Sequence, residues 1–336
     1  NQRLDIPYIK KDGVFTKSSW EEAYKIISKK IYSTESKEIA GLTGDLTNMQ
    51  TLFIIKEFFS KTIKSSNLDS RSEHIFINNK ERSNYLFNSK INGIEESDFI
   101  LLVGSNPRYE ATMLNARIRK SYLKNNTEIF SIGDVGNLTY PYTVLSNKTE
   151  TIKEIVDDKH EISAKIKKSK KPIIIIGQSV LKLNSGNYVV EKFNEYLKKN
   201  SKINNEWNAF NIISNNASTV GSYDLNILSS KEKTNKVLKG IEDKKFKILF
   251  LFGQDNINFK KNNEFVVYIG SHGDKGAEIS DVILPGAAYT EQDGFFTNLE
   301  GKLQKAYKAS YPPGEAKEDW SIINELSNKI KSKKLY

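Results

Sequence analysis

The stretch DVILPGAAYTEQDGFFTNLEGKLQ (residues 281–304) joins a predicted buried strand to an unusually polar segment. The apolar run, residues 282–284, stops at the turn-forming pair Pro285-Gly286. Polar side chains then surround two phenylalanines: Glu291, Asp293, Asn298 and Glu300. Carboxylates and amides at this density are typical of a cofactor site, or of a tight loop whose backbone donors need acceptors.

Apolar runs that end in glycine recur along the whole chain. They are FILLVG (99–104), PIIIIG (172–177), ILFLFG (248–253) and VVYIG (266–270). Continuous apolar strands that alternate with helical segments indicate parallel sheets covered on both faces. The predicted fold class is therefore α/β, with two doubly wound, mainly parallel-sheet lobes and a C-terminal tail.

The predicted lobes follow one another along the chain. Residues 157–171 are charged and poor in core residues, which favours a boundary there. We expect a first α/β lobe with an N-terminal extension over 1–165 and a second α/β lobe over 166–280. Residues 281–336 would form a closing segment and a C-terminal helix.

Two helices are predicted in the N-terminal part. Residues 15–32 carry apolar side chains at helical spacing, with Ser18 or Ser19 placed to cap the helix. Residues 48–63 predict a second amphipathic helix.

The strand ends admit two interpretations. In doubly wound folds ligands bind at the carboxyl ends of the strands, so glycines such as Gly44, Gly104 and Gly253 could cradle a nucleotide-like molecule. Alternatively, glycine at a strand exit permits a tight turn and close backbone approach. Spacing alone favours the second interpretation slightly.

Composition restricts the possible functions. The chain has 336 residues, a net charge of +10 and no cysteine. Disulfides and cysteine-ligated zinc or iron–sulfur sites are therefore excluded within it. Its apolar runs are too short to cross a bilayer. The lysines are spread along the chain rather than clustered, so we expect no nucleic-acid partner.

No motif predicts catalysis. The sequence lacks a phosphate-binding GxxxxGK[ST] loop, a GxGxxG turn after a strand and a GxSxG elbow. The Glu291/Asp293 pair and His272 are more typical of loop structure, with His272 expected to bind a backbone carbonyl in a turn. We therefore expect no catalytic, cofactor-binding or metal-binding residues.

One predicted helix carries three arginines: Arg108, Arg117 and Arg119. Their planar guanidinium groups suit contacts with the acids of a neighbouring subunit. The alternative is a solvated or ion-paired helix face. We predict that they are subunit-interface residues.

The segment 281–304 resembles a signature of the molybdopterin oxidoreductase superfamily. More narrowly, the chain resembles the large C-terminal domain of the largest iron–sulfur subunit of respiratory complex I (NADH:ubiquinone oxidoreductase). The matching segments occur in the family's order: SWEEA (19–23), residues 82–123, GDVGNLTY (133–140), residues 270–291 and residues 311–327. Residues 181–245 match poorly.

The resemblance implies a molybdoenzyme-like fold without a working molybdenum site. In that family the clusters lie in a cysteine-rich N-terminal half, which this sequence does not contain. We therefore expect no cofactor in this chain, and a non-catalytic structural or assembly role in the peripheral, NADH-oxidising arm. The expected partners are a separate chain equivalent to the cluster-bearing half and other complex I subunits, without direct membrane insertion.

Two further expectations follow from the resemblance. The chain would lie on the matrix side of the mitochondrial inner membrane, or on the cytoplasmic face of a bacterial membrane. The Lys/Asn/Ile bias and the lack of a presequence-like segment fit a product of a mitochondrial genome, or a processed import product. The alternative function is an active oxidoreductase that retains a pterin or nucleotide between its lobes.

Overall fold

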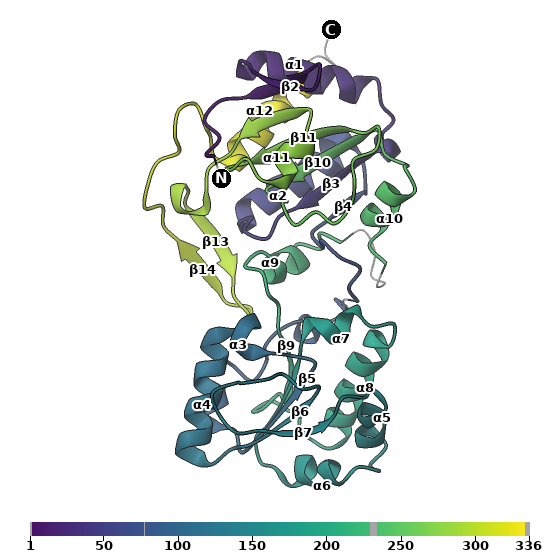
Figure 1. Ribbon diagram of the computed structural model, residues 1–336, viewed down its shortest axis with the longest axis vertical. Helices are drawn as coiled ribbons and strands as arrows, with labels where there is room; N and C mark the ends of the chain where they lie inside the picture. The colour runs from purple at the N-terminus through teal and green to yellow at the C-terminus, as the bar shows by residue number, and fades with distance from the viewer. Residues whose placement is uncertain (1, 77, 229–233, 333–336) are drawn as a thin grey trace.

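A computed structural model describes residues 2–76, 78–228 and 234–332 (Figure 1). The first lobe is built on a seven-stranded sheet in the order β2-β1-β12-β11-β10-β3-β4. Its strands are β1 (Tyr8–Lys11), β2 (Val14–Lys17), β3 (Ile39–Thr43), β4 (Leu68–Asp69), β10 (Ile248–Phe252), β11 (Phe265–Gly270) and β12 (Val282–Pro285). β1 pairs antiparallel with both β2 and β12, and the remaining pairs are parallel.

The second lobe contains a five-stranded, fully parallel sheet in the order β7-β6-β5-β8-β9. Its strands are β5 (Phe99–Val103), β6 (Glu128–Ile132), β7 (Thr143–Ser146), β8 (Pro172–Ile176) and β9 (Phe210–Ile212). Every residue of β5, β8 and β9 is buried, as expected for strands covered on both faces. A separate hairpin, β13 (Gly294–Thr297) and β14 (Leu303–Ala306), extends from the first lobe to the second (Figure 1).

Helices cover both faces of each sheet. In the first lobe they are α1 (Trp20–Tyr32), α2 (Met49–Glu57), α9 (Thr219–Asp224), α10 (Lys236–Glu242), α11 (Lys275–Ile279) and α12 (Asp319–Ser332). In the second lobe they are α3 (Pro107–Glu110), α4 (Thr112–Asn125), α5 (Glu150–Val156), α6 (Glu161–Lys168), α7 (Gln178–Lys182) and α8 (Gly186–Lys199). Short helical turns are η1 (Ser36–Glu38), η2 (Phe58–Ile63), η3 (Arg82–Asn84), η4 (Asn92–Glu96) and η5 (Tyr289–Glu291). Each sheet has one apolar core on each face, which confirms two doubly wound α/β lobes.

The two N-terminal helices form close to their predicted positions. The Ser19 side chain caps α1 by accepting the Glu22 N–H at 3.2 Å. The second predicted helix, 48–63, is instead α-helical only to Glu57 and continues as the wider turn η2. In η2, Phe58 and Phe59 pack edge-to-face against Phe250 of β10, so tertiary packing accompanies the change of helix type.

The two sheets are not built from the consecutive ranges predicted for the lobes and the closing segment, which are 1–165, 166–280 and 281–336. β10 and β11 lie in the predicted second lobe but belong to the first sheet, and β12 of the predicted closing segment joins them. β10 pairs with β3 in parallel, from Ile248 opposite Ile39 to Phe252 opposite Thr43. The predicted ranges were wrong because strand order depends on which apolar strands fit together in a sheet, and adjacency in sequence does not determine it.

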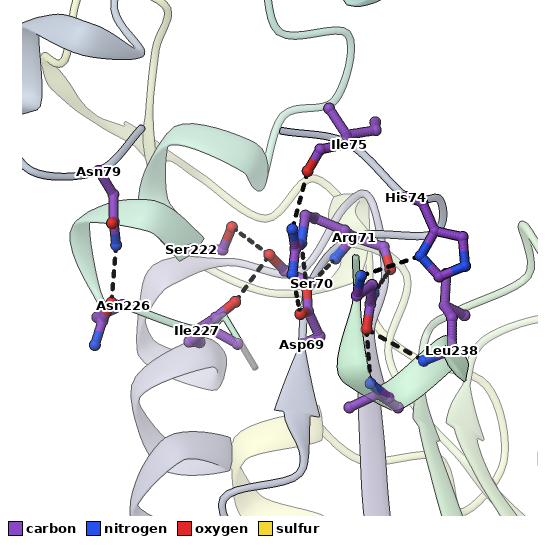
Figure 2. A network of polar contacts seen from close by, with 12 residues as sticks. Asp69, Ser70, Arg71, His74, Ile75, Asn79, Ser222, Asn226, Ile227 and Leu238 are labelled. Atoms are coloured by element: carbon purple, nitrogen blue, oxygen red, sulfur yellow. Dashed lines mark hydrogen bonds and ion pairs between the residues drawn. The ribbon is translucent and has the colours of Figure 1, made fainter. Parts of the chain in front are cut away.

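The chain leaves the first lobe after β4 and returns to it before α10. Polar contacts join these two crossing segments at the end of β4 (Figure 2). The Arg71 guanidinium binds the Asp69 carboxylate at 2.7 Å, with the two side chains only 1% and 0% exposed. The returning segment joins them, since Asn235 Nδ2 donates to the Arg71 carbonyl and Ser222 Oγ lies 2.8 Å from Ser70 Oγ. This buried polar network fixes where the chain leaves and re-enters the first lobe.

We expect the substitution Arg71→Ala to lower the free energy of unfolding by about 3–5 kcal/mol, because the Asp69 charge would stay buried without its guanidinium. Urea denaturation followed by circular dichroism measures this change. Lys239→Ala is the control, since it removes an exposed ion pair with Asp243 and is expected to change stability far less than Arg71→Ala does. Equal effects of the two substitutions would contradict the assigned role of the buried pair.

Candidate functional site

A cavity of about 300 Å³ opens at the carboxyl ends of β3, β10, β11 and β12. This edge is where doubly wound folds bind ligands. The loops after the strands supply most of its wall, and the first residue of α12 completes it. The residues that carry its chemistry are Asp45, Gln254, Asp255, His272, Asp274 and Asp319.

The glycines at the strand ends serve close packing of the backbone. A Cβ atom on Gly44 would lie 1.8 Å from the Gly253 carbonyl oxygen, so these two strand exits touch directly. In the second lobe, a Cβ on Gly177 would lie 2.3 Å from the Gly104 carbonyl oxygen. These contacts confirm that glycine permits close backbone approach at both pairs of strand exits.

The cavity wall is acidic. It includes four aspartates, and none of its lining residues is a lysine or arginine. Arg3 lies nearby but binds the Glu291 carboxylate and the Ser271 carbonyl. A cavity with this wall disfavours anionic groups.

Burial raises the pKa of three acids of this wall. It raises the pKa of Asp45, and the neighbouring charge of Asp255 adds to the effect. Burial also raises the pKa of Asp255, although its carboxylate accepts the Tyr268 hydroxyl at 2.9 Å and the Gly276 N–H at 3.0 Å. Desolvation, followed by repulsion from Glu318, raises the pKa of Asp319 to about 7.

His272 has a different partner from the one predicted. Its Nδ1 lies 2.9 Å from the Ser271 hydroxyl, rather than binding a backbone carbonyl. The Ser271 side chain therefore provides a hydrogen-bond partner for the His272 ring within the turn. In the described ranges, no group of three or more His, Cys, Asp or Glu side chains is arranged to hold a metal ion.

The polar side chains of 281–304 bind backbone groups, as the loop interpretation predicted. Glu291 accepts the Ala288 N–H at 2.9 Å, and Asp293 accepts the Lys308 N–H at 2.9 Å. Asn298 Oδ1 accepts the N–H groups of both Glu300 and Lys302, which closes the turn between β13 and β14.

The same turn also makes contacts that the sequence did not predict, because its tip binds the second lobe (Figure 1). The Phe87 N–H donates to the Leu299 carbonyl at 2.8 Å, and the Ile91 N–H donates to Glu300 at 2.5 Å. Arg82, which is paired with Asp224, donates to the Gly301 carbonyl at 2.7 Å. Residues 299–301 therefore connect the two lobes and also form the turn between β13 and β14.

The three predicted interface arginines lie on the α3–α4 side of the second lobe and contact their own chain. Arg108 donates to the Asn137 carbonyl at 2.7 Å, and Arg119 donates to the Thr139 carbonyl at 3.3 Å. Arg117 forms an ion pair with Glu95. Their role at a subunit interface stays a prediction.

Sequence reasoning missed Asp319 as a member of the cavity wall. It lies next to Trp320 at the start of α12, far along the chain from the strand ends, and nothing in the local pattern marks it. Asp255 follows the apolar run 248–253 closely in the sequence, but its proximity to Asp45 depends on the pairing of β3 with β10.

A family model for molybdopterin oxidoreductases matches residues 3–329. The chain belongs to the molybdopterin oxidoreductase family. It is 40% identical over its full length to the NADH-ubiquinone oxidoreductase 75 kDa subunit of Reclinomonas americana, of which it covers 50%. It is 38% identical over 98% of its length to an NADH-quinone oxidoreductase subunit of Rickettsia bellii, of which it covers 47%. The chain thus spans about half the length of these curated relatives.

Solved structures share the fold. A chain of the formyltransferase/hydrolase complex of Methylorubrum extorquens matches with a TM-score of 0.69 over 98% of this chain and 100% of that chain, at 11% identity. Acetylene hydratase of Pelobacter acetylenicus matches with a TM-score of 0.60 over 99% of this chain and 62% of that chain, at 12% identity. At such identities the likeness concerns the fold alone.

The residues of the cavity do not fit a molybdopterin dinucleotide. Such a cofactor carries two phosphates, which favour arginine, lysine or free backbone N–H donors. Here the wall holds four aspartates and no lysine or arginine, and Asp255 already accepts the Gly276 N–H at the start of α11. No chemical step through this cofactor follows from the geometry.

The contact between the strand exits is testable with Gly44→Ala. Overpacking of this kind costs about 1–3 kcal/mol or more, so we expect a lower thermal midpoint. Gly273→Ala is a matched control, because the nearest atom to its Cβ would be the Gln2 carbonyl oxygen at 3.7 Å, an ordinary contact. A Gly44→Ala protein as stable as the Gly273→Ala protein would refute the close approach.

The pKa of Asp319 predicts a pH dependence of stability. The unfolded carboxyl titrates near 3.8 and the folded one near 7, so between these values only the folded chain keeps the proton. The contribution of Asp319 to stability therefore falls as pH rises from about 4 to 7 and stays low above that range. We expect Asp319→Asn to gain stability relative to the wild type over this window, measured by urea denaturation at several pH values. A constant difference between the two proteins would contradict the prediction.

Proposed function

We propose that the chain is a non-catalytic structural subunit of the peripheral arm of respiratory complex I. The observation that carries this proposal is its 40% identity, over its full length, to a 75 kDa NADH-ubiquinone oxidoreductase subunit, in a sequence without cysteine. Without cysteine, the chain offers no thiolate for an iron–sulfur cluster. Electron transfer would then belong to other chains, and this domain would support their assembly.

The acidic cavity supports the non-catalytic role. A pterin dinucleotide in this cavity would place its phosphates against partly buried aspartates, at an electrostatic cost. The alternative function, an oxidoreductase that retains a pterin or nucleotide between its lobes, therefore finds no lysine or arginine in the wall of this cavity. Purified protein that released stoichiometric pterin would favour that alternative.

The proposed partners are a chain equivalent to the cluster-bearing half of the longer relatives and other peripheral-arm subunits. We propose the matrix side of the mitochondrial inner membrane as its location, because mitochondrial relatives include the 78 kDa subunit of Candida albicans, 37% identical to this chain. Within the described residues, no helix combines the length and apolar character needed to cross a bilayer.

We expect the chain to co-migrate with NADH dehydrogenase activity on a native gel of detergent-solubilised membranes. The measurement combines in-gel activity staining with an immunoblot for this chain. A small species separate from the active band would overturn the proposed function. A sample treated with denaturant before loading provides the position of the free chain.

A further inference from the structure

A second hollow on the first lobe is apolar. This α2–hairpin groove, of about 680 Å³, lies between α2, the end of α9, the β13–β14 hairpin and the start of α12. Its main apolar residues are Met49, Phe53, Phe295, Leu303 and Trp320. Three of them are large and well exposed: Leu303 at 60%, Phe53 at 49% and Trp320 at 42%.

Such a surface is unfavourable in water. Apolar side chains gathered in one hollow mark interaction sites, because burying them removes apolar area from solvent. The hairpin adds a second reason, since an isolated two-stranded hairpin is only marginally stable. β13 packs against α2 and α9, while Leu303 on β14 stays largely uncovered. A partner that filled the groove would complete the packing of the hairpin.

The charge of the groove restricts the partner. Asp293 and Glu318 line it, and no lysine or arginine does. Asp293 accepts the Lys308 backbone N–H, and Glu318 accepts the Trp320 indole N–H. Neither carboxylate forms a salt bridge within the described part of the chain, so a basic residue of the partner would find both acids available.

The hairpin also argues against addition of a partner strand. Lys302 precedes β14 and Lys305 lies within it, and both are exposed. Lysines on an edge strand oppose pairing with a further strand. An amphipathic helix instead presents apolar residues at i, i+3, i+4 and i+7, which suits a concave apolar groove.

We infer that the α2–hairpin groove is the docking site for an amphipathic helix of a protein partner. The apolar face of that helix lies against Phe53, Leu303 and Trp320, and a lysine or arginine on it meets Asp293 and Glu318. This inference rests on the proposed function and deepens it, since it names the surface by which the chain joins the assembly.

Hydroxyl-radical footprinting with mass spectrometry provides the first test. The chain is oxidised alone and within the purified, NADH-active assembly, and each residue is compared between the two samples. We expect oxidation of Phe53, Leu303 and Trp320 to fall severalfold in the assembly. Equal oxidation in both samples overturns the inference. Protection in the isolated chain together with a dimeric mass also overturns it, because the occupant would then be a second copy.

Substitutions provide the second test, with the intact assembly as the readout. Leu303→Asp and Glu318→Lys are expected to stay folded, as circular dichroism checks, and to lose most of their co-migration with the active band. Val14→Asp is the matched control, because Val14 is 65% exposed on β2 and lies outside the groove lining. We expect it to co-migrate like the wild type.

The outcomes separate the two proposals. If the wild type co-migrates and the folded groove variants do so equally, the groove inference fails and the structural role stands. If the wild type itself does not co-migrate, the proposed function fails and the inference falls with it. If Glu318→Lys loses co-migration and Glu318→Gln keeps it, the loss is caused by the introduced positive charge, as expected for a basic partner residue at this position.

Discussion

The parallel pairing of β3 with β10 is the constraint on which the first lobe depends. It joins residues 39–43 to residues 248–252, with the whole second lobe inserted between them in the sequence. Both strands are fully buried, and the Gly44 N–H continues the pairing by donating to the Phe252 carbonyl at 2.8 Å. Because the strand exits touch at Gly44 and Gly253, the loops that follow must diverge around a small cavity.

That geometry explains why acids from distant segments meet. Asp45 follows β3, Asp255 follows β10, and Asp319 begins a helix that packs against α1 and α2. Burial raises the pKa of all three acids, with a further contribution from the Asp255 charge at Asp45 and from the Glu318 charge at Asp319. The cavity thus keeps the position of a ligand site in a doubly wound fold, while its charge opposes a phosphate-bearing ligand.

Two of the connections between the lobes are polar contacts of the described residues that the sequence did not predict. The buried Asp69–Arg71 pair orders the crossing segments, and the tip of the β13–β14 hairpin binds the second lobe through Leu299, Glu300 and Gly301. The polar segment 281–304, whose composition is typical of a cofactor site, therefore connects the first lobe to the second.

The sequence by itself determined the fold class, the main strands, the cap of α1 at Ser19 and the absence of thiolate ligands. These features depend on local patterns, on residue type and on the resemblance of ordered motifs to a known family. Only the tertiary structure decided the strand order, the division of the chain into lobes, the acidic cavity and the contacts of the hairpin tip. The physical reason is that each of these requires side chains or strands far apart in sequence to meet, and local periodicity carries no information about which partners will fit.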